Sequence, residues 1–390
     1  MQSTRVISVA DGADRSVPPR VMQICLSESW GGLEMSPGRI TPELQRQGWE
    51  VHGMALAGTR VEAAFRTAGV APLTFRSRSA SLMAIWRVLR YLKQHDIRVL
   101  HAHKSSDMRI GALLVTLWPE LRLFFTEHMG VKKPKKDFYH RWAYSRASRV
   151  FSISHAAFTW NREALPVREG QLLQLYEGVD FSAFGGLPST AHRRRIRHSL
   201  GLSDGVIAIG LPGRVSPSKG HEVWLEALRR LDKVPGMPLW CGVVIGEASG
   251  RDAQPGGFAE QLAERVEEAG LSDRVVFAGF RDDLPDCLQA IEIACIPSVN
   301  EAFGLSVIEA MAAGCAVIGS ASGAIPELVS EDRGRTADPN DPAAWAAALG
   351  ELLGNPELRM QLGQASSQWV RGKFELSRHV KALTHYYRAQ

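Results

Sequence analysis

Short apolar segments alternate with segments of helical periodicity along this chain, in two separate series. The apolar segments of the first series are RVMQICLS (20–27), GWEVHGMAL (48–56), IRVLHAH (97–103), LRLFFTEH (121–128) and SRVFSISH (148–155). Those of the second series are GVIAIGLPGRV (205–215), LWCGVVIGE (239–247), RVVFAGF (274–280), IEIACIPSV (291–299) and CAVIGS (315–320). Continuous apolar strands are typical of parallel sheets that are buried on both faces. The alternation therefore predicts an α/β chain with two doubly wound, Rossmann-like sheets in series.

A break between the two series sets the expected domain boundary. The segment FGGLPSTAHRRRI (184–196) gathers Gly, Pro, Ser and Thr before the pattern restarts. We expect an N-terminal domain over 21–185, a C-terminal domain over 186–375 and a loose tail over 1–20. Ligands of such sheets bind beyond the carboxyl ends of the strands, so two domains in series favour a cleft between them.

The composition is that of a globular protein, with 45% hydrophobic and 22% charged residues in 390. The apolar run GALLVTLW (111–118) is far shorter than the ~20 residues of a membrane-spanning helix. The N-terminus has no apolar stretch behind a basic start, so we expect no signal peptide. The five cysteines form no C-x-x-C pair and are expected to be buried thiols in a reducing cytoplasm.

Charge is distributed unevenly between the two predicted domains. Residues 1–185 hold 25 Lys and Arg against 16 Asp and Glu, a net charge of +9. The remainder holds 21 against 25, a net charge of −4. This asymmetry indicates that the two halves bind different partners.

The stretch EAFGLSVIEAMAAG (301–314) places two carboxylates beside an apolar helix. Glu301 lies in the loop that follows a predicted strand, and Glu309 lies on the helix that closes at Gly314. Backbone N–H groups at 303–305 would form a helix N-terminus, which attracts anions, and Gly304 lets a ligand approach closely. A carboxylate at each end and an anion site between them suit a sugar nucleotide. A structural reading, with Glu301 as a helix cap and Glu309 in solvent, is the alternative.

The same stretch resembles the E-x7-E signature of the retaining glycosyltransferases of family 4, which have the GT-B fold. GRVSPSKG (213–220) is similar to the family's G-R-x-x-x-x-K-G segment, and WGGLEM (30–35) to its N-terminal Gly-Gly loop. HAH (101–103) and TEH (126–128) resemble its histidines near the cleft, and YEGVD (176–180) its N-G-V-D, with Glu177 in place of Asn. The likeness spans roughly 21–385, and its GGLEM segment looks like that of enzymes of lipopolysaccharide core and other envelope glycans. It implies two Rossmann-like domains facing across a cleft, with the last helix (376–390) returning to the first domain.

The resemblance also implies roles for individual residues. The expected catalytic residues are His128, Glu301, Arg214 and Lys219. The expected donor-binding residues are Gly31, Gly32, Arg214, Lys219, Phe280, Arg281, Glu301, Ala302, Phe303, Gly304, Leu305 and Glu309. Arg214 and Lys219 would neutralise the departing diphosphate, as a planar fork and a point charge. Since the chain has no Asp-x-Asp pair, we expect no metal and no other cofactor.

A basic and aromatic segment, KKPKKDFYHRWAYSRASR (132–149), is the main candidate for the acceptor side. Lys and Arg beside Trp and Tyr favour anionic membrane surfaces, although a solvated helix face is the plain alternative. We expect Lys132, Lys133, Lys135, Lys136 and the nearby His103 on the acceptor or membrane side. No nucleic-acid module is present. The expected partners are therefore a nucleotide-sugar donor, a glycan or lipid-linked acceptor and an anionic inner-membrane surface, with the protein cytoplasmic and peripherally attached.

Two other functions remain open at this point. A sugar-nucleotide epimerase of the same fold would release nucleoside diphosphate without an acceptor, and a two-lobed sugar-binding protein would catalyse nothing. UDP-sugar is the preferred donor, ahead of GDP- and ADP-sugars. One local expectation concerns the first helix: because Pro37 and Pro42 stand where it should run, we expect it to start late, with Ser36 or Thr41 as its N-cap.

Overall fold

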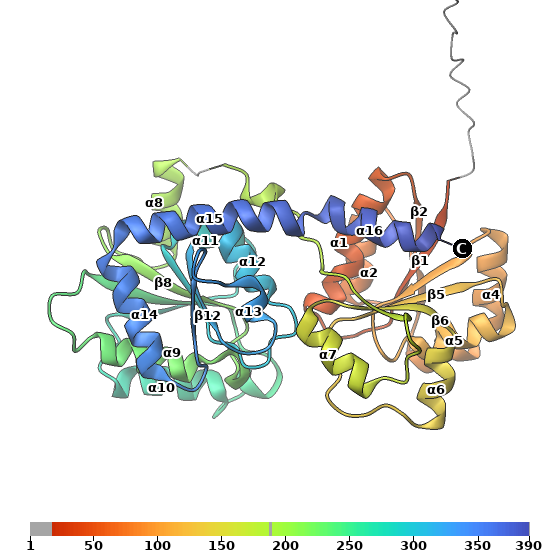
Figure 1. Cartoon of the computed structure of the whole chain (residues 1–390), viewed down its shortest axis with the longest axis horizontal. Coiled ribbons are helices and arrows are strands. Elements are labelled where there is room, and N and C mark those ends of the chain that lie inside the picture. Colours follow the sequence, from red (N-terminus) through yellow and green to blue (C-terminus); the bar gives the residue numbers. More distant parts are fainter. Residues whose placement is uncertain (1–17, 187–188, 390) are drawn as a thin grey trace, which may run out of the picture.

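The computed structural model describes residues 18–186 and 189–389, and it contains two parallel β-sheets that lie side by side (Figure 1). Residues 1–17 of the expected tail lie outside the described residues. The first sheet has seven strands in the order β3-β2-β1-β4-β5-β6-β7. The second has six strands in the order β10-β9-β8-β11-β12-β13. Every strand pairing in both sheets is parallel, which confirms the predicted fold class.

The first domain alternates strands and helices as the apolar pattern predicts. Its strands are β1 (Arg20–Cys25), β2 (Glu50–Leu56), β3 (Leu73–Phe75), β4 (Val99–Ala102), β5 (Arg122–Glu127), β6 (Ala147–Ser152) and β7 (Leu172–Gln174). Its helices are α1 (Gly32–Arg46), α2 (Arg60–Thr67), α3 (Arg78–Met83), α4 (Ile85–Gln94), α5 (Met108–Leu117), α6 (Phe138–Ser145) and α7 (His155–Ala164). Alternate residues of β1 enter two different core layers: Met22 and Ile24 join one, and Val21 and Cys25 join the other. The sheet is therefore covered on both faces.

The second domain repeats this plan. Its strands are β8 (Ile207–Pro212), β9 (Trp240–Ile245), β10 (Val275–Gly279), β11 (Ile293–Ile296), β12 (Ala316–Ser320) and β13 (Arg335–Ala337). Its α-helices are α8 (Thr190–Ser199), α9 (His221–Leu231), α10 (Phe258–Glu268), α11 (Leu284–Ala290), α12 (Leu305–Ala312), α13 (Ile325–Leu328), α14 (Pro342–Gly354) and α15 (Pro356–Phe374). Short 3-10 turns are η1 (Ser182–Phe184), η2 (Pro217–Lys219) and η3 (Gly250–Ala253).

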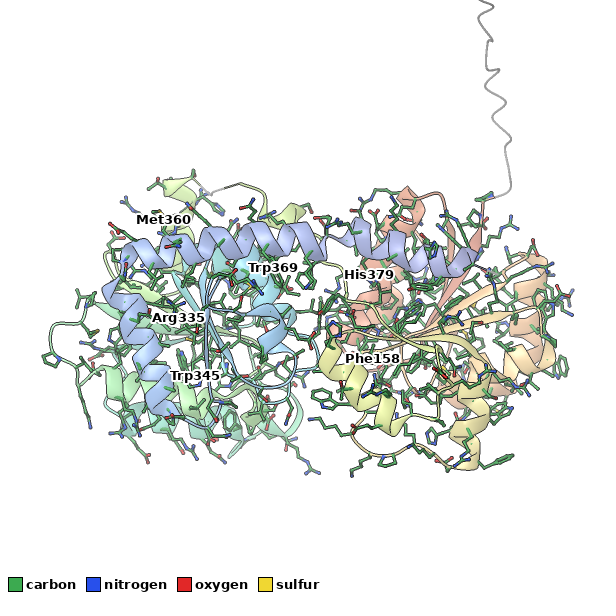
Figure 2. All side chains as sticks on the ribbon, viewed as in Figure 1. Phe158, Arg335, Trp345, Met360, Trp369 and His379 are labelled. Atoms are coloured by element: carbon green, nitrogen blue, oxygen red, sulfur yellow. The ribbon has the colours of Figure 1, made fainter. Side chains whose placement is uncertain are left out.

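The last helix, α16 (Leu376–Arg388), follows α15 directly and crosses from the second domain to the first (Figure 1). Its side chains Val380, Leu383 and Tyr387 are buried in a core layer of the first sheet. In Figure 2, Trp369 of α15 lies over the second domain and His379 of α16 over the first. The two helices therefore connect the domains along one side of the molecule.

The expected late start of the first helix is wrong. Helix α1 begins at Gly32 and contains both Pro37 and Pro42 in its interior. Each proline leaves a carbonyl four residues earlier without its N–H partner. Side chains also bond carbonyls of this helix, since Thr41 Oγ1 donates to the carbonyl of Pro37 at 2.7 Å and Arg39 donates to that of Gly32 at 3.2 Å, but neither is a carbonyl that a proline leaves unpaired.

A carboxylate from the second domain also binds the first domain directly. Glu327 of α13 accepts hydrogen bonds from the backbone N–H groups of His155 (2.9 Å) and Ala156 (2.7 Å), at the N-terminus of α7. The same carboxylate accepts from the Tyr176 hydroxyl at 3.0 Å. A negative charge at a helix N-terminus is stabilising. Beside it, Ser154 Oγ donates to the Ala302 carbonyl at 2.6 Å, so these contacts bring the EAFG loop against α7.

The junction between α15 and α16 generates a stability prediction at Gly178. A Cβ there would lie 2.7 Å from Leu376 Cα and from His379 Cβ. Gly178→Ala should therefore destabilise the fold by about 1–3 kcal/mol through overpacking. Denaturant unfolding measures this change.

Gly372 provides the matched control at the same junction. A Cβ on Gly372, inside α15, would have no heavy atom within 4 Å. Gly372→Ala should leave stability unchanged or raise it by up to about 1 kcal/mol. Equal unfolding midpoints for both variants and the wild type would contradict the tight contact.

Candidate active site

A cavity of about 390 Å³ lies between the two domains, at the carboxyl ends of the parallel strands. Loops from both domains contribute to its wall. It is lined by Gly31, Gly32, Leu33, Glu34, His128, Met129, Ile153, Glu177, Arg214, Ser218, Lys219, Val299, Asn300, Glu301, Ala302, Phe303, Gly304 and Leu305. Of the residues that the sequence nominated as catalytic or donor-binding, the structure brings ten together here: Gly31, Gly32, His128, Arg214, Lys219 and the run 301–305.

Two helices begin at this cavity, one from each domain. Helix α1 starts at Gly32, and α12 starts at Leu305. The two ends are close, since a Cβ on Gly32 would lie 3.4 Å from Leu305 Cδ1. Gly304, the N-cap of α12, has a φ of +96°, which is in the left-handed range that favours glycine. Both N-termini present unpaired backbone N–H groups and the positive ends of helix dipoles, so the cavity is suited to an anion.

Basic side chains add to this positive field. Lys219 Nζ pairs with Glu301 Oε2 at 2.7 Å, and both side chains are about one quarter exposed. Arg214 is exposed, and among the described residues no carboxylate lies within ion-pair distance of it. It is close to α1, because a Cβ on Gly31 would lie 3.9 Å from Arg214 Nη2. Arg214 is therefore available to an anionic ligand, whereas Lys219 is shared with Glu301.

The loop that carries Arg214 and Lys219 is held against strand β11. Gly220 has a φ of +73°, and a Cβ there would lie 2.3 Å from the carbonyl oxygen of Pro297. The second glycine of GRVSPSKG is therefore required by a left-handed turn and by close backbone packing. This packing aims the basic residues into the cavity.

Two histidines of the first domain lie one behind the other. His128 lines the cavity, and its Nδ1 is hydrogen-bonded to the carboxylate of Glu177. Its Nε2 lies 3.3 Å from Nδ1 of His103, which is buried behind it. Burial lowers the pKa of His103 well below its usual value, so this ring is neutral. Although burial acts to raise the pKa of Glu177, the nearby His128 and Arg39 lower it below its usual value.

Other nominated residues lie outside the cavity wall. Glu309 is half-buried on α12, and burial raises its pKa to about 6, against the opposing charge of Arg39. Arg281 is bound to Asp283 at 2.7 Å, and Phe280 is 56% exposed; neither lines the cavity. Their proposed contact with the base stays a prediction.

The four lysines of the basic segment also lie outside this cavity. Lys132 lies over the Trp160 ring at 4.7 Å, and Lys135 Nζ donates to Ser105 Oγ at 2.7 Å. Lys133 and Lys136 are exposed, as is Phe138 at 87%. The segment 132–149 thus presents the positive charges of exposed lysines beside an exposed aromatic ring.

Several cavity residues were not nominated by the sequence. Glu34 accepts from Ser27 Oγ at 2.8 Å and lies in the WGGLEM loop that had been singled out for its glycines. Asn300 has a φ of +56°, unusual for a non-glycine residue, but a sequence alone does not display this. Glu177 could have been nominated from the sequence, because it replaces the Asn of the family's N-G-V-D segment.

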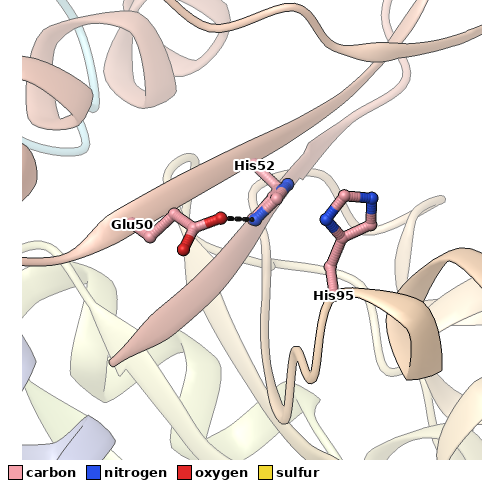
Figure 3. A group of neighbouring side chains, drawn as sticks. All are labelled: Glu50, His52 and His95. Atoms are coloured by element: carbon pink, nitrogen blue, oxygen red, sulfur yellow. Dashed lines mark hydrogen bonds and ion pairs between the residues drawn. The ribbon is translucent and has the colours of Figure 1, made fainter. Parts of the chain in front are cut away.

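A group of potential metal ligands lies away from this cavity, at the start of β2 (Figure 3). Among the described residues, Glu50, His52 and His95 have ligand atoms within 4.8 Å of one another. Hydrogen bonds and ring packing hold this arrangement. His52 contacts Glu50 Oε1 and Tyr91 OH, each at 3.0 Å, and Glu50 Oε2 accepts from Arg20 at 2.8 Å. The His95 ring packs on that of Tyr91, with ring centroids 4.3 Å apart. The group therefore does not bear on the chemistry of the cavity, and metal independence there stays a prediction.

Comparison with known proteins assigns the class. Residues 30–183 match the model "Glycosyltransferase Family 4", and residues 192–369 match "Glycosyl transferases group 1". A solved glycosyltransferase from Rickettsia africae has a TM-score of 0.83, at 19% identity, over 95% of this chain and 98% of that one. Anabaena HepE in complex with UDP has a TM-score of 0.80, at 19% identity, over 94% and 98%. The fold is that of the GT-B glycosyltransferases.

Curated relatives support the same assignment at the level of sequence. The lipopolysaccharide core biosynthesis mannosyltransferase LpcC of Rhizobium leguminosarum is 30% identical over 318 residues, 77% of this chain and 80% of the relative. A D-inositol 3-phosphate glycosyltransferase of Corynebacterium jeikeium is 34% identical over 320 residues, 77% and 74% of the two chains. The chain belongs to the family 4 glycosyltransferases, as the motifs indicated.

The positive field of the cavity predicts that inorganic pyrophosphate binds without a metal ion. In buffer with EDTA, pyrophosphate should raise the melting temperature of the wild type, because it binds the folded form only. Arg214→Gln should weaken this binding by roughly tenfold or more, the usual worth of a charge-assisted hydrogen bond. Calorimetric titration gives the affinities.

Arg90→Gln, at an exposed arginine of α4, is the matched control and should bind as the wild type does. Binding that requires Mg²⁺, or that is equal in Arg214→Gln and wild type, would contradict the role assigned to Arg214.

Proposed function

We propose that the protein is a retaining glycosyltransferase that moves a sugar from a nucleotide-sugar, with UDP-sugar preferred, to a lipid-linked or lipopolysaccharide-type glycan. The observation that carries this proposal is the cavity between the domains, where two helix N-termini meet beside Arg214 and Lys219. The reaction is proposed to need no metal and to take place in the cytoplasm, at the inner-membrane surface.

The diphosphate is assigned to the centre of the cavity. When the bond from the sugar to the β-phosphate breaks, negative charge grows on the leaving phosphate. Groups that are already oriented toward that charge stabilise the transition state without reorganising. Backbone N–H groups at the start of α1 and α12, the Arg214 fork and the Lys219 ammonium are groups of this kind. A UDP complex of the similar Anabaena protein supports the choice of nucleotide.

The carboxylates are assigned to hydroxyl groups of the donor. Glu301 is held in place by Lys219 at 2.7 Å, so its free lone pairs have a defined direction toward sugar hydroxyls. Glu309 lies four residues into α12 and is assigned to the ribose, where a carboxylate can accept from both hydroxyls. His128 on the opposite wall is assigned to the transferred sugar.

The acceptor is assigned to the first domain. This half carries a net charge of +9 and the segment 132–149 with exposed Lys133, Lys136 and Phe138. A basic surface with an exposed aromatic ring favours an anionic membrane or a phosphorylated lipid-linked glycan. The names of the relatives include lipopolysaccharide core mannosyltransferases, which supports a glycan acceptor. No helix among the described residues is long and apolar enough to cross a membrane.

A panel of nucleotide-sugars tests the proposal, each incubated with and without a cell-envelope lipid extract, in EDTA. The proposal expects nucleoside diphosphate release that depends on the extract, and sugar transferred with its anomeric configuration retained. Lys219→Ala should abolish the release. Release without an acceptor and with an epimerised sugar would favour the epimerase, and binding without turnover of any donor would favour a sugar-binding protein.

The raised pKa of Glu309 predicts a pH-dependent donor affinity. Because its pKa in the ligand-free protein is about 6, the protonated carboxyl predominates below that pH and the carboxylate above it. The carboxylate accepts from both hydroxyls in charge-assisted hydrogen bonds, which the neutral carboxyl cannot form, so donor affinity should rise as pH increases from 5 to 7. In Glu309→Gln the affinity should be about 10–100-fold weaker at pH 7 and flat across this range. Calorimetric titration with the active donor measures both effects.

Glu264→Gln, at an exposed glutamate of α10, is the control and should follow the wild-type curve. If Glu309→Gln kept the affinity and the slope of the wild type, the ribose contact would be wrong.

The basic segment predicts attachment to anionic vesicles. Replacing Lys132, Lys133, Lys135 and Lys136 with Ser should weaken binding to phosphatidylglycerol-containing vesicles by roughly two to three decades, at near 1 kcal/mol per basic residue. Co-sedimentation measures the loss, and donor affinity should stay unchanged.

A second quadruple variant controls for net charge. It replaces four exposed basic residues of the second domain, Arg194, Arg195, Lys233 and Arg251, with Ser. Its vesicle binding should stay near that of the wild type. Equal losses in both variants, or no binding by the wild type, would rule out a membrane face at 132–149.

A further inference from the structure

Glu177 and His128 form a buried pair at the cavity wall. Their side chains are 6% and 3% exposed, and Glu177 Oε1 is hydrogen-bonded to His128 Nδ1. Glu177 stands where a neutral Asn is expected, so this chain has added a negative charge at a buried position. A buried charge is costly unless a partner compensates for it.

The hydrogen bonds around the pair define the protonation state of His128. His103 Nε2 lies 2.7 Å from the amide oxygen of Gln23, while the amide nitrogen of Gln23 is buried without a hydrogen-bond partner among the described residues. In this amide orientation the oxygen only accepts, so His103 Nε2 carries the proton. His103 is neutral, and its Nδ1 is therefore an acceptor. His128 Nε2, 3.3 Å away, must donate to it. His128 Nδ1 must also donate, because the Glu177 carboxylate only accepts. With the Gln23 amide in this orientation, His128 carries two protons and a positive charge.

The charged and titratable groups around the pair come from every element packed against it. Arg39 of α1 has Nη2 at 3.7 Å from Glu177 Oε2. His101 and His103 of β4 are buried and neutral, since burial lowers the pKa of both well below the usual value. His379 of α16 donates from Nδ1 to the Tyr176 carbonyl at 2.7 Å, and its pKa is also lowered by burial. Glu127 of β5 is also buried beside His128, but burial raises its pKa above the usual value, whereas the pKa of Glu177 is lowered. Glu177 is therefore the carboxylate that balances the charge of His128.

We propose that Glu177 is a positioning residue that keeps His128 doubly protonated and orients its ring toward the transferred sugar. The contact from His128 Nε2 to His103 is longer than most N–H hydrogen bonds, so a sugar hydroxyl or phosphate oxygen in the cavity can replace it. The Glu177 contact fixes the other nitrogen during that exchange. His128 then donates a charge-assisted hydrogen bond to the substrate. This inference rests on the proposed transferase function for its kinetic consequence only.

Nitrogen NMR of ¹⁵N-histidine-labelled protein, without any ligand, tests the ion pair. The His128 ring signals are assigned by their loss in His128→Gln. In the wild type at pH 7, both ring nitrogens should be protonated. In Glu177→Gln, which keeps the side-chain shape, the fraction of protein at pH 7 with both His128 nitrogens protonated should fall severalfold, because the opposite charge is lost. Glu43→Gln removes another buried glutamate of the first domain and should leave the His128 signals unchanged.

Kinetics with the active donor and acceptor tests the consequence for turnover. In Glu177→Gln, kcat at pH 8 should fall by about tenfold or more, with a smaller change in KM, and should recover as pH is lowered and His128 regains its proton. Glu177→Asp, which keeps the negative charge, should leave His128 doubly protonated. A purely structural role would not produce recovery at low pH.

Two results would overturn the inference. One is a neutral His128 in the wild type at pH 7, and the other is an equal fraction of doubly protonated His128 in wild type and Glu177→Gln. If Glu177→Gln fails to fold, Glu177→Asn is measured in its place. Since NMR needs no donor, a protonated His128 in a protein without transferase activity would refute the proposed function and leave the ion pair intact.

Discussion

Two helices from different domains begin at one cavity, and the site depends on that convergence. In a parallel sheet, helices that follow strands start at the carboxyl edge, so α1 after β1 and α12 after β11 each direct an N-terminus to the edge of their own sheet. The two edges must face each other for both dipoles to act on one ligand. Contacts between the two domains hold the edges in this arrangement. They include the hydrogen bonds of the Glu327 carboxylate at the start of α7 and the crossing of α15 and α16 from one domain to the other. The contacts that hold the two domains together therefore also bring the two helix N-termini to one anion site.

The charges of the cavity are arranged in compensated pairs with one exception. Lys219 is paired with Glu301, and His128 with Glu177, so these carboxylates cost little although they stand beside a site for an anion. Arg214 is exposed, and no carboxylate among the described residues lies within ion-pair distance of it. An incoming diphosphate would thus meet Arg214 and two helix N-termini first. Pairing also gives Glu301 and His128 defined directions, which binding of a hydroxyl-rich sugar requires.

Much of this architecture could be predicted from the sequence, because buried parallel strands and glycine-dependent turns leave local signatures. Gly220 and Gly304 adopt left-handed backbone, and both occur inside motifs that the sequence displays. Features that depend on tertiary contacts were not predictable. Helix α1 runs through Pro37 and Pro42, and the partnership of Glu177 with His128 joins residues 49 positions apart.

The most direct measurement is a crystal structure of the protein soaked with a nucleoside diphosphate in metal-free solution. The structure predicts density for the diphosphate in the cavity between the domains, within hydrogen-bonding distance of Arg214 and of backbone N–H groups at the start of both α1 and α12. A nucleotide bound elsewhere, or bound in the cavity by one domain alone, would contradict the claim that the two helix N-termini act together.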